Sequence, residues 1–170
     1  MSEREFRTWL DTNAGELLGE IGVRENQIVL DYGCGPGKCT VPAARIVGDG
    51  GKVYALDINA TALQNVRKKA QKARLRNIQI IHSDGTPSTE LPQAGVDVAL
   101  LYDVMQKIDD WRPLFSELHR ILRPHGLLSV FPMHVGKGKL LSRMDQCGLF
   151  GLTDEFRGHV FNFRKLEVAS

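Results

Sequence analysis

The chain has 170 residues, of which 42% are hydrophobic and 25% charged, and its formal net charge at pH 7 is +2. These values predict one globular domain with a single core, and they give no support for general electrostatic attraction to nucleic acid or membranes. No apolar stretch approaches the roughly 20 residues of a membrane span, and the charged N-terminus lacks the apolar core of a signal peptide. We therefore expect a cytoplasmic protein.

Strand-length apolar runs alternate with amphipathic helical segments, the pattern of an α/β domain with a parallel sheet. In chain order we expect a helix within residues 1–20, a strand at 27–33, a helix at 38–48, a strand at 52–57, a helix at 59–73, strands at 77–84 and 96–104, a helix at 109–126 and a strand at 127–133. Asn59 is a plausible N-cap of the third helix, and Asp110 of the fourth.

The C-terminal part has a different pattern. Residues 137–151 predict a helix with a glycine stop signal, and residues 152–158 and 159–168 predict two strands joined tightly around Gly158. The last strand alternates aromatic and polar residues, so we expect one aromatic and one polar face. A hairpin fits this pattern better than another crossover unit.

Small and acidic residues gather where the expected strands end. The first strand runs through Asp31 into a turn with glycines at 33, 35 and 37, and the second ends in Asp57. The third ends in Asp84 and Gly85, and the fourth in Tyr102 and Asp103. Because ligands of open parallel sheets bind at the carboxyl ends of the strands, these residues form a candidate binding site.

The chemistry of this site suits a nucleoside with a positive charge. An acid about 20 positions beyond a glycine turn can accept hydrogen bonds from both ribose hydroxyls, and Asp57 has that place. Asp84 can accept from an exocyclic amine such as that of adenine. A dinucleotide fingerprint would need glycine at position 38, where the chain has Lys38, and Pro36 removes a backbone donor that a phosphate could use.

These motifs resemble those of the class I S-adenosylmethionine-dependent methyltransferases. The stretch "VLDYGCGPG" is similar to the family's glycine motif, "VYALDI" to its ribose motif, "HSDG" to its adenine motif, and "LRPHGLL" to its helix-to-strand turn. Within that family, the sequence most resembles the small, general methyltransferases that include quinone-biosynthesis enzymes. The resemblance implies a Rossmann-like three-layer sandwich, with a seven-stranded, mostly parallel sheet whose last strand is antiparallel.

The resemblance also implies S-adenosylmethionine as cofactor and S-adenosylhomocysteine as product. Asp31 would support the loop and the cofactor's amino group, and the three glycines would lie under its methionine part. The full set of expected cofactor contacts is Asp31, Gly33, Cys34, Gly35, Gly37, Asp57, Ile58, Asp84, Gly85 and Tyr102. We expect one domain, with an N-terminal helix at 1–25, a cofactor core at 26–132 and a C-terminal part at 133–170.

The acceptor is not specified by any motif. A small molecule is the expected acceptor, while RNA, protein or precorrin-type acceptors stay open, as do a homo-oligomer and a non-catalytic cofactor-binding subunit. Asp103 and His134 are weak candidates for a general base. Trp9, Tyr102, Met105 and Met133 could line the acceptor pocket or simply pack in the core.

Other conspicuous residues have simpler interpretations. The basic run at 67–76 is expected on a solvated helix face rather than in a nucleic-acid site. The three cysteines have no metal-like or disulfide spacing. We expect Cys34 to be a small filler beside the ligand, and Cys39 and Cys147 to be inert core residues.

Overall fold

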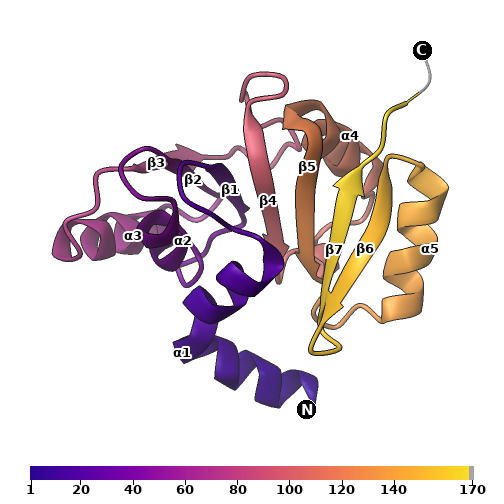
Figure 1. The fold of residues 1–170 in the computed structure, drawn as a ribbon, viewed down its shortest axis with the longest axis horizontal. Helices are drawn as coiled ribbons and strands as arrows, with labels where there is room; N and C mark the ends of the chain where they lie inside the picture. The colour runs from indigo at the N-terminus through magenta and orange to yellow at the C-terminus, as the bar shows by residue number, and fades with distance from the viewer. Residues whose placement is uncertain (169–170) are drawn as a thin grey trace. The chain divides into compact units, whose positions relative to one another are not determined.

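The computed structural model describes residues 1–168 (Figure 1). Its contacts divide the chain into two compact units, residues 1–85 and residues 86 onward, which are described in turn. The first contains α1 (Glu3–Ile21), β1 (Ile28–Tyr32), α2 (Thr40–Val47), β2 (Lys52–Asp57), α3 (Ala60–Lys72) and β3 (Ile78–His82). The second contains β4 (Val96–Tyr102), the 3₁₀ turn η1 (Met105–Lys107), α4 (Arg112–Ile121), β5 (Leu122–Phe131), α5 (Lys137–Cys147), β6 (Phe150–Phe156) and β7 (Val160–Lys165).

Three parallel strands form the sheet of the first unit, with β2 between β1 and β3. The inner aliphatic residues of β1 and β2 are buried, as expected for parallel strands covered by helices: Val29, Leu30, Val53, Ala55 and Leu56. Asn59 caps α3 as predicted, because its side chain accepts the amide hydrogen of Ala62. Leu63 and Val66 on the same helix pack into the core beside Ala55, which fixes α3 against β2.

Helix α1 has local signals at both ends. A capping box joins Ser2 and Glu5 at its start, and Gly22 adopts the left-handed conformation at its end. Its apolar side chains Phe6, Leu10, Leu17 and Leu18 are all buried. Within residues 1–168, no helix combines the length and the apolar character that a membrane span requires.

The second unit joins a parallel strand pair to an antiparallel hairpin. Strand β5 pairs parallel with β4 and antiparallel with β7, which in turn pairs antiparallel with β6. The seven strands form one sheet in the order β3-β2-β1-β4-β5-β7-β6. The predicted α/β fold, with its mostly parallel seven-stranded sheet and terminal hairpin, is confirmed. That the whole chain acts as one methyltransferase domain stays a prediction.

Three local expectations are wrong. Helix α4 begins at Arg112 with Trp111 at its N-cap, so Asp110 is not the N-cap, although its carboxylate does accept the Arg112 amide hydrogen at 3.1 Å. The helix also ends at Ile121, because the backbone becomes extended at Leu122 and β5 begins there, before Pro124. The register between β4 and β5 then shifts, which places the segment before Leu127 outside the regular pairing.

The third correction concerns the last strand. Its predicted polar face is only partly solvated, because Arg164 is exposed whereas Asn162 is buried. Ser129, which pairs with Asn162 on β5, is buried too, so this part of the sheet face lies in the interior. Alternation along a single strand could not show that a polar position would face the interior.

Candidate functional site

The glycine turn after β1 is held by backbone bonds to the end of β2. The amides of Gly33 and Cys34 both donate to the Leu56 carbonyl, at 2.8 and 3.0 Å. Gly33, Gly35 and Gly37 have φ values of 73°, 52° and 86°, a region that favours glycine. This backbone conformation explains why three glycines fall within five residues.

The glycines differ in what surrounds them. A side-chain carbon added at Gly35 would meet no described atom within 4 Å, so the turn presents bare backbone to open space there. One added at Gly37 would lie 3.1 Å from Val66 of α3, which means that Gly37 is required for helix packing whether or not a ligand binds. Gly35 is therefore the position at which a ligand can approach the backbone.

Asp57 lies against this turn from the end of β2. Its Oδ2 accepts the Gly35 amide hydrogen at 2.7 Å and its Oδ1 accepts that of Asn59 at 2.9 Å. An ionised carboxylate has about four acceptor positions, so each oxygen retains capacity for a further donor. The carboxylate predicted from spacing alone is thus next to the glycine turn.

Asp31 is buried beneath the same turn. Its carboxylate accepts a hydrogen bond of 2.6 Å from the hydroxyl of Thr40, the first residue of α2. Burial raises the pKa of Asp31 to about 6, the Thr40 hydrogen bond opposes this, and the nearby Asp57 charge adds to the rise. Thr40 was missed from the sequence; its only signal was its place at the start of the helix after the glycine turn.

Ile58, Asp84 and Gly85 lie at the carboxyl ends of β2 and β3. Ile58 is 66% exposed, which is unusual for a large apolar side chain and leaves its surface available to a ligand. The Ser83 amide donates to the Asp57 carbonyl at 2.9 Å, so the segment after β3 stays beside the end of β2. Asp84 and Gly85 follow directly and are exposed. The structure therefore brings together nine of the ten predicted cofactor contacts in the first unit.

Two lysines that sequence reasoning did not assign hold the turn from outside. Lys69 of α3 donates to the Pro36 carbonyl at 2.7 Å, and Lys38 forms an ion pair with Asp11 of α1. Lys38 occupies the position where a dinucleotide fingerprint would have glycine. The other cations of the basic run lie exposed on α3 and in the turn after it, as expected for a solvated face.

The tenth predicted contact, Tyr102, belongs to the second unit. It ends β4, its ring packs edge-on against Phe131, and its hydroxyl lies 2.9 Å from that of Ser129. All three side chains are buried. This polar pair is part of the interior, and contact between Tyr102 and a cofactor stays a prediction.

The two candidate bases follow β4 and β5. Asp103 has φ of 58° and His134 φ of 62°, conformations that few non-glycine residues adopt. The Asp103 carboxylate accepts a hydrogen bond from the Gln106 side chain, which orients it. His134 is exposed and lines a hollow at the ends of these strands. A catalytic role for either residue stays a prediction.

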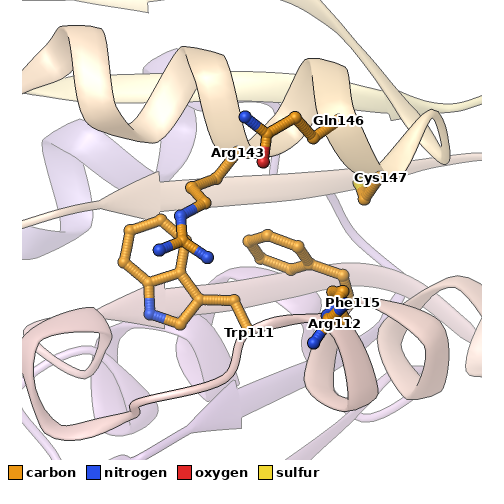
Figure 2. A pocket seen from close by; sticks show the side chains of 6 residues that line it. All are labelled: Trp111, Arg112, Phe115, Arg143, Gln146 and Cys147. Carbon is orange, nitrogen blue, oxygen red and sulfur yellow. The ribbon is translucent and has the colours of Figure 1, made fainter.

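The cysteines are not nucleophiles of this site. Burial raises the pKa of the Cys34 and Cys39 thiols well above the ordinary value, so both stay protonated. Cys147 is not a core residue as expected, because it is half-buried and lines a hollow between α4 and α5 (Figure 2). Among residues 1–168, no group of three or more acidic, histidine or cysteine side chains could hold a metal ion.

Comparison with known proteins identifies this arrangement. Residues 30–130 match the family model described as "Methyltransferase domain". The chain is 26% identical over 112 residues to the demethylmenaquinone methyltransferase of Geobacillus stearothermophilus, covering 66% of this chain and 47% of that protein. It is 33% identical over 110 residues to the ubiquinone/menaquinone biosynthesis C-methyltransferase UbiE of Pectobacterium carotovorum, covering 64% and 43%. The chain thus spans about half the length of the curated relatives it matches.

Solved structures share the fold over a longer range. A SAM-dependent methyltransferase from Aquifex aeolicus has a TM-score of 0.79 at 20% identity, covering 97% of this chain and 98% of that one. A SAM-dependent O-methyltransferase from Thermotoga maritima has a TM-score of 0.71 at 16% identity, covering 93% and 66%. With the glycine turn and its carboxylates in place, and with the family model spanning more than half of its length, the chain belongs to the class I S-adenosylmethionine-dependent methyltransferases.

Proposed function

We propose that the first unit binds S-adenosylmethionine at the glycine turn and that the protein transfers its methyl group to a small molecule. One observation carries the cofactor assignment: the Asp57 carboxylate lies against Gly35, where the backbone faces open space. A nucleoside in that space could donate its ribose hydroxyl hydrogens to the Asp57 carboxylate, and it could lie close to the backbone because Gly35 has no side chain.

The charges of the site fit the cofactor. The first unit has carboxylates at Asp31, Asp57 and Asp84, at or just beyond the ends of its three strands. Such a cluster attracts a cationic ligand and repels phosphates. This favours a sulfonium nucleoside over a nicotinamide dinucleotide, whose pyrophosphate would approach the same turn.

Each residue of the site then has a defined task. Asp57 accepts hydrogen bonds from the ribose hydroxyls, Ile58 covers one face of the base, and Asp84 with Gly85 meets its edge. Gly33 and Gly35 admit the methionine part, and Asp31 supports the turn through Thr40. Cys34 fills the space beneath.

The bound cofactor supplies a methyl group that is already activated by the positive charge on sulfur. The contribution of the protein is to hold an acceptor atom in line with that methyl group, and such positioning can supply several kcal/mol of the barrier reduction. A general base is needed only when the acceptor must lose a proton, and Asp103 and His134 are the candidates.

A small-molecule acceptor is supported by the relatives, which are methyltransferases of quinone biosynthesis. These relatives are about twice as long as the matched region, so their acceptor is not transferred to this chain. Cytoplasmic location, exclusion of nucleic acid and homo-oligomer formation stay predictions.

Calorimetric titration with S-adenosylmethionine, S-adenosylhomocysteine and NAD tests the cofactor assignment. We expect micromolar binding of both sulfur nucleosides and none of NAD. Asp57→Ala should weaken binding about tenfold or more, because each lost charge-assisted hydrogen bond is worth roughly 1.5–3 kcal/mol. Asp49→Ala is the matched control, an exposed acid in the turn before β2. NAD binding without the sulfur nucleosides, or an unchanged affinity in Asp57→Ala, would show the assignment to be wrong.

Methyl transfer needs its own measurement, because a non-catalytic cofactor-binding subunit would also pass the titration. The protein is incubated with cofactor carrying a labelled methyl group and a panel of small acceptors. Appearance of labelled product supports the enzyme. Tight cofactor binding with no transfer to any acceptor, but transfer on addition of a partner methyltransferase, would instead identify a subunit.

A further inference from the structure

A hollow of about 250 Å³ lies at the carboxyl ends of β4 and β5, entirely within the second unit. Residues of the segment after β4, of the segment after β5 and of α5 line it. A second hollow of about 230 Å³, between α4 and α5, shares Trp111 and Arg143 with the first. Together they approach the size of a small-ligand site, and neither has a role in the cofactor assignment.

Trp111 is a fixed wall of both hollows. Its side chain is buried, and its indole N–H donates to the carbonyls of Ile108 at 2.9 Å and Met105 at 3.2 Å. Its ring also packs edge-on against Phe115, with centroids 6.1 Å apart. The bonded N–H and the contact with Phe115 restrain the ring, so it offers a fixed surface to whatever lies over it.

Two cations lie over this ring. The guanidinium carbon of Arg143 is 5.4 Å from the ring centroid and the Nζ of Lys139 is 5.9 Å from it. Figure 2 shows the Arg143 side chain extended from α5 across the indole. Both distances are within the range of cation–π attraction, which restrains these flexible side chains before any ligand arrives.

The positive charge of this pair is not neutralised by an ion pair. Across residues 1–168, neither Lys139 nor Arg143 has a carboxylate oxygen within 4.0 Å. The nearby Asp110 is held by Arg112 through two contacts of 3.0 and 3.1 Å, and Arg112 is also the main cause of its lowered pKa, to which Arg143 adds less. Asp109 is the carboxylate that lines the hollow.

We propose that this hollow binds a small molecule bearing a carboxylate group, with Arg143 and Lys139 as its anchors, and that this molecule is the methyl acceptor. Two cations and one lining carboxylate leave a net charge that complements a monoanion better than a phosphate dianion. The planar guanidinium of Arg143 matches the geometry of a carboxylate. The role as acceptor rests on the proposed function, whereas binding of the anion does not.

Benzoate is the probe for binding, and its neutral isostere benzamide is the matched ligand control. The chain has two tryptophans, so their indole N–H signals in a ¹H–¹⁵N NMR spectrum report two places in the molecule. A Trp9→Phe variant assigns them. We expect benzoate to shift the Trp111 signal saturably, to leave the Trp9 signal in place, and to bind at least about tenfold more tightly than benzamide.

Variants test the anchors. Arg143→Gln and Lys139→Gln should each weaken benzoate binding by about tenfold, and Arg143→Lys should restore part of the loss, because a charge returns without the planar group. Lys68→Gln removes an equal charge from the exposed face of α3 and should change nothing. Thermal melting of each variant confirms that it is folded. Equal binding of benzoate and benzamide, or benzoate binding that Arg143→Gln and Lys139→Gln leave unchanged, overturns the proposal.

The acceptor role is tested by methyl transfer to the phenol oxygen of 4-hydroxybenzoate and 4-hydroxybenzamide. The O–CH3 bond forms as the S–CH3 bond of S-adenosylmethionine breaks, S-adenosylhomocysteine leaves, and the phenolic proton passes to a base or to solvent. The acid should be methylated with a lower KM than the amide, and Arg143→Gln should raise that KM with little change in kcat. Benzoate binding with no S-adenosylmethionine binding would overturn the proposed function and leave the anion site standing. Cofactor binding with no benzoate response would overturn the anion site alone.

Discussion

The two units end their parallel strands in different ways. In the first, β1, β2 and β3 run into glycines and carboxylates, and the backbone at Gly35 faces open space. In the second, β4 and β5 lead to a buried indole with two cations over it. The proposed cofactor site therefore rests on exposed backbone and short acids, whereas the proposed anion site rests on an aromatic ring and two long cationic side chains.

The largest effect on cofactor affinity is expected from filling the open space at the glycine turn. Gly35→Val places a branched side chain at φ of 52°, where a valine is strained, and directs it to where the ligand approaches. We expect the affinity for S-adenosylmethionine to fall about 100-fold or more, as overpacking costs roughly 1–3 kcal/mol beyond the lost contacts. Calorimetric titration measures the change.

Backbone strain alone could lower affinity by destabilising the protein, so a matched variant is needed. Gly148 ends α5 in the left-handed conformation with φ of 64°, and an added side-chain carbon there also meets no described atom within 4 Å. Gly148→Val should cost a similar free energy of unfolding, about 1–3 kcal/mol, and leave cofactor affinity within about twofold. Equal losses of affinity in both variants would remove Gly35 from the site.

The sequence predicted the glycine turn with the acid beside it, but of the second unit's hollow only Met105 and His134, for a physical reason. The conformation of a tight turn is local, so glycines at 33, 35 and 37 and an acid at 57 could be assigned without tertiary structure. The pairing of Trp111 with Arg143 depends on how α5 packs beside α4, and no spacing along the chain encodes it. The burial of Asn162 likewise depends on what covers that face of the sheet, which periodicity along one strand does not contain.

Glu117 of α4 provides a test of the second unit's stability. Its carboxylate accepts hydrogen bonds from the Thr89 amide and hydroxyl, at 2.9 and 2.6 Å, and pairs with Arg120 at 2.7 Å. We expect Glu117→Gln to lower the free energy of unfolding at pH 7 by about 2 kcal/mol, since the bonds involve a charge and Thr89 is buried. Glu90→Gln, an adjacent exposed acid, should change it by less than about 0.5 kcal/mol.

The pH dependence of Glu117 follows from its pKa, which Arg120 and Thr89 hold at about 2 against an ordinary value of 4.5. A lowered folded-state pKa adds stability above pH 4.5, and this stability is lost as the pH falls toward 2. Chemical denaturation between pH 2 and pH 7 should therefore show the difference between Glu117→Gln and the wild type shrinking with acid. A constant difference over that range would contradict the charged hydrogen bonds.

The stability contribution of Asp31 should depend on pH in the opposite direction to that of Glu117. Its pKa is raised to about 6, so the folded state favours the protonated form, and this contribution is lost as the pH rises through 6. Asp31→Asn keeps an acceptor for Thr40 and removes the buried charge. We expect the variant to be about 1–2 kcal/mol more stable than the wild type at pH 8, with the gap closing as the pH falls toward 3.8, the ordinary pKa of the group.

The same variant should bind S-adenosylmethionine more weakly, because a carboxylate that attracts the cationic cofactor is gone. Denaturation at pH 8 and near pH 3.8, together with a cofactor titration at pH 8, makes the comparison. A variant less stable than the wild type at pH 8 would show that the ionised form of Asp31 is favoured in the fold after all.

The smallest expected effect concerns Asn59, the N-cap of α3, and shows whether cofactor affinity depends on this helix. Asn59 contributes twice: its side chain caps α3 through the Ala62 amide at 3.1 Å, and its own amide donates to Asp57. Asn59→Ala removes the cap and keeps the backbone donor. The free energy of unfolding should fall by about 1 kcal/mol, as for other lost N-caps, with cofactor affinity changed less than about twofold.

Ser2→Ala removes the cap of α1 and serves as the control for stability. A larger loss of cofactor affinity in Asn59→Ala than in Ser2→Ala would mean that Asp57 depends on the capped helix for its position against the glycine turn. Cofactor recognition in the first unit would then rest on positioned side chains as well as on the open backbone at Gly35.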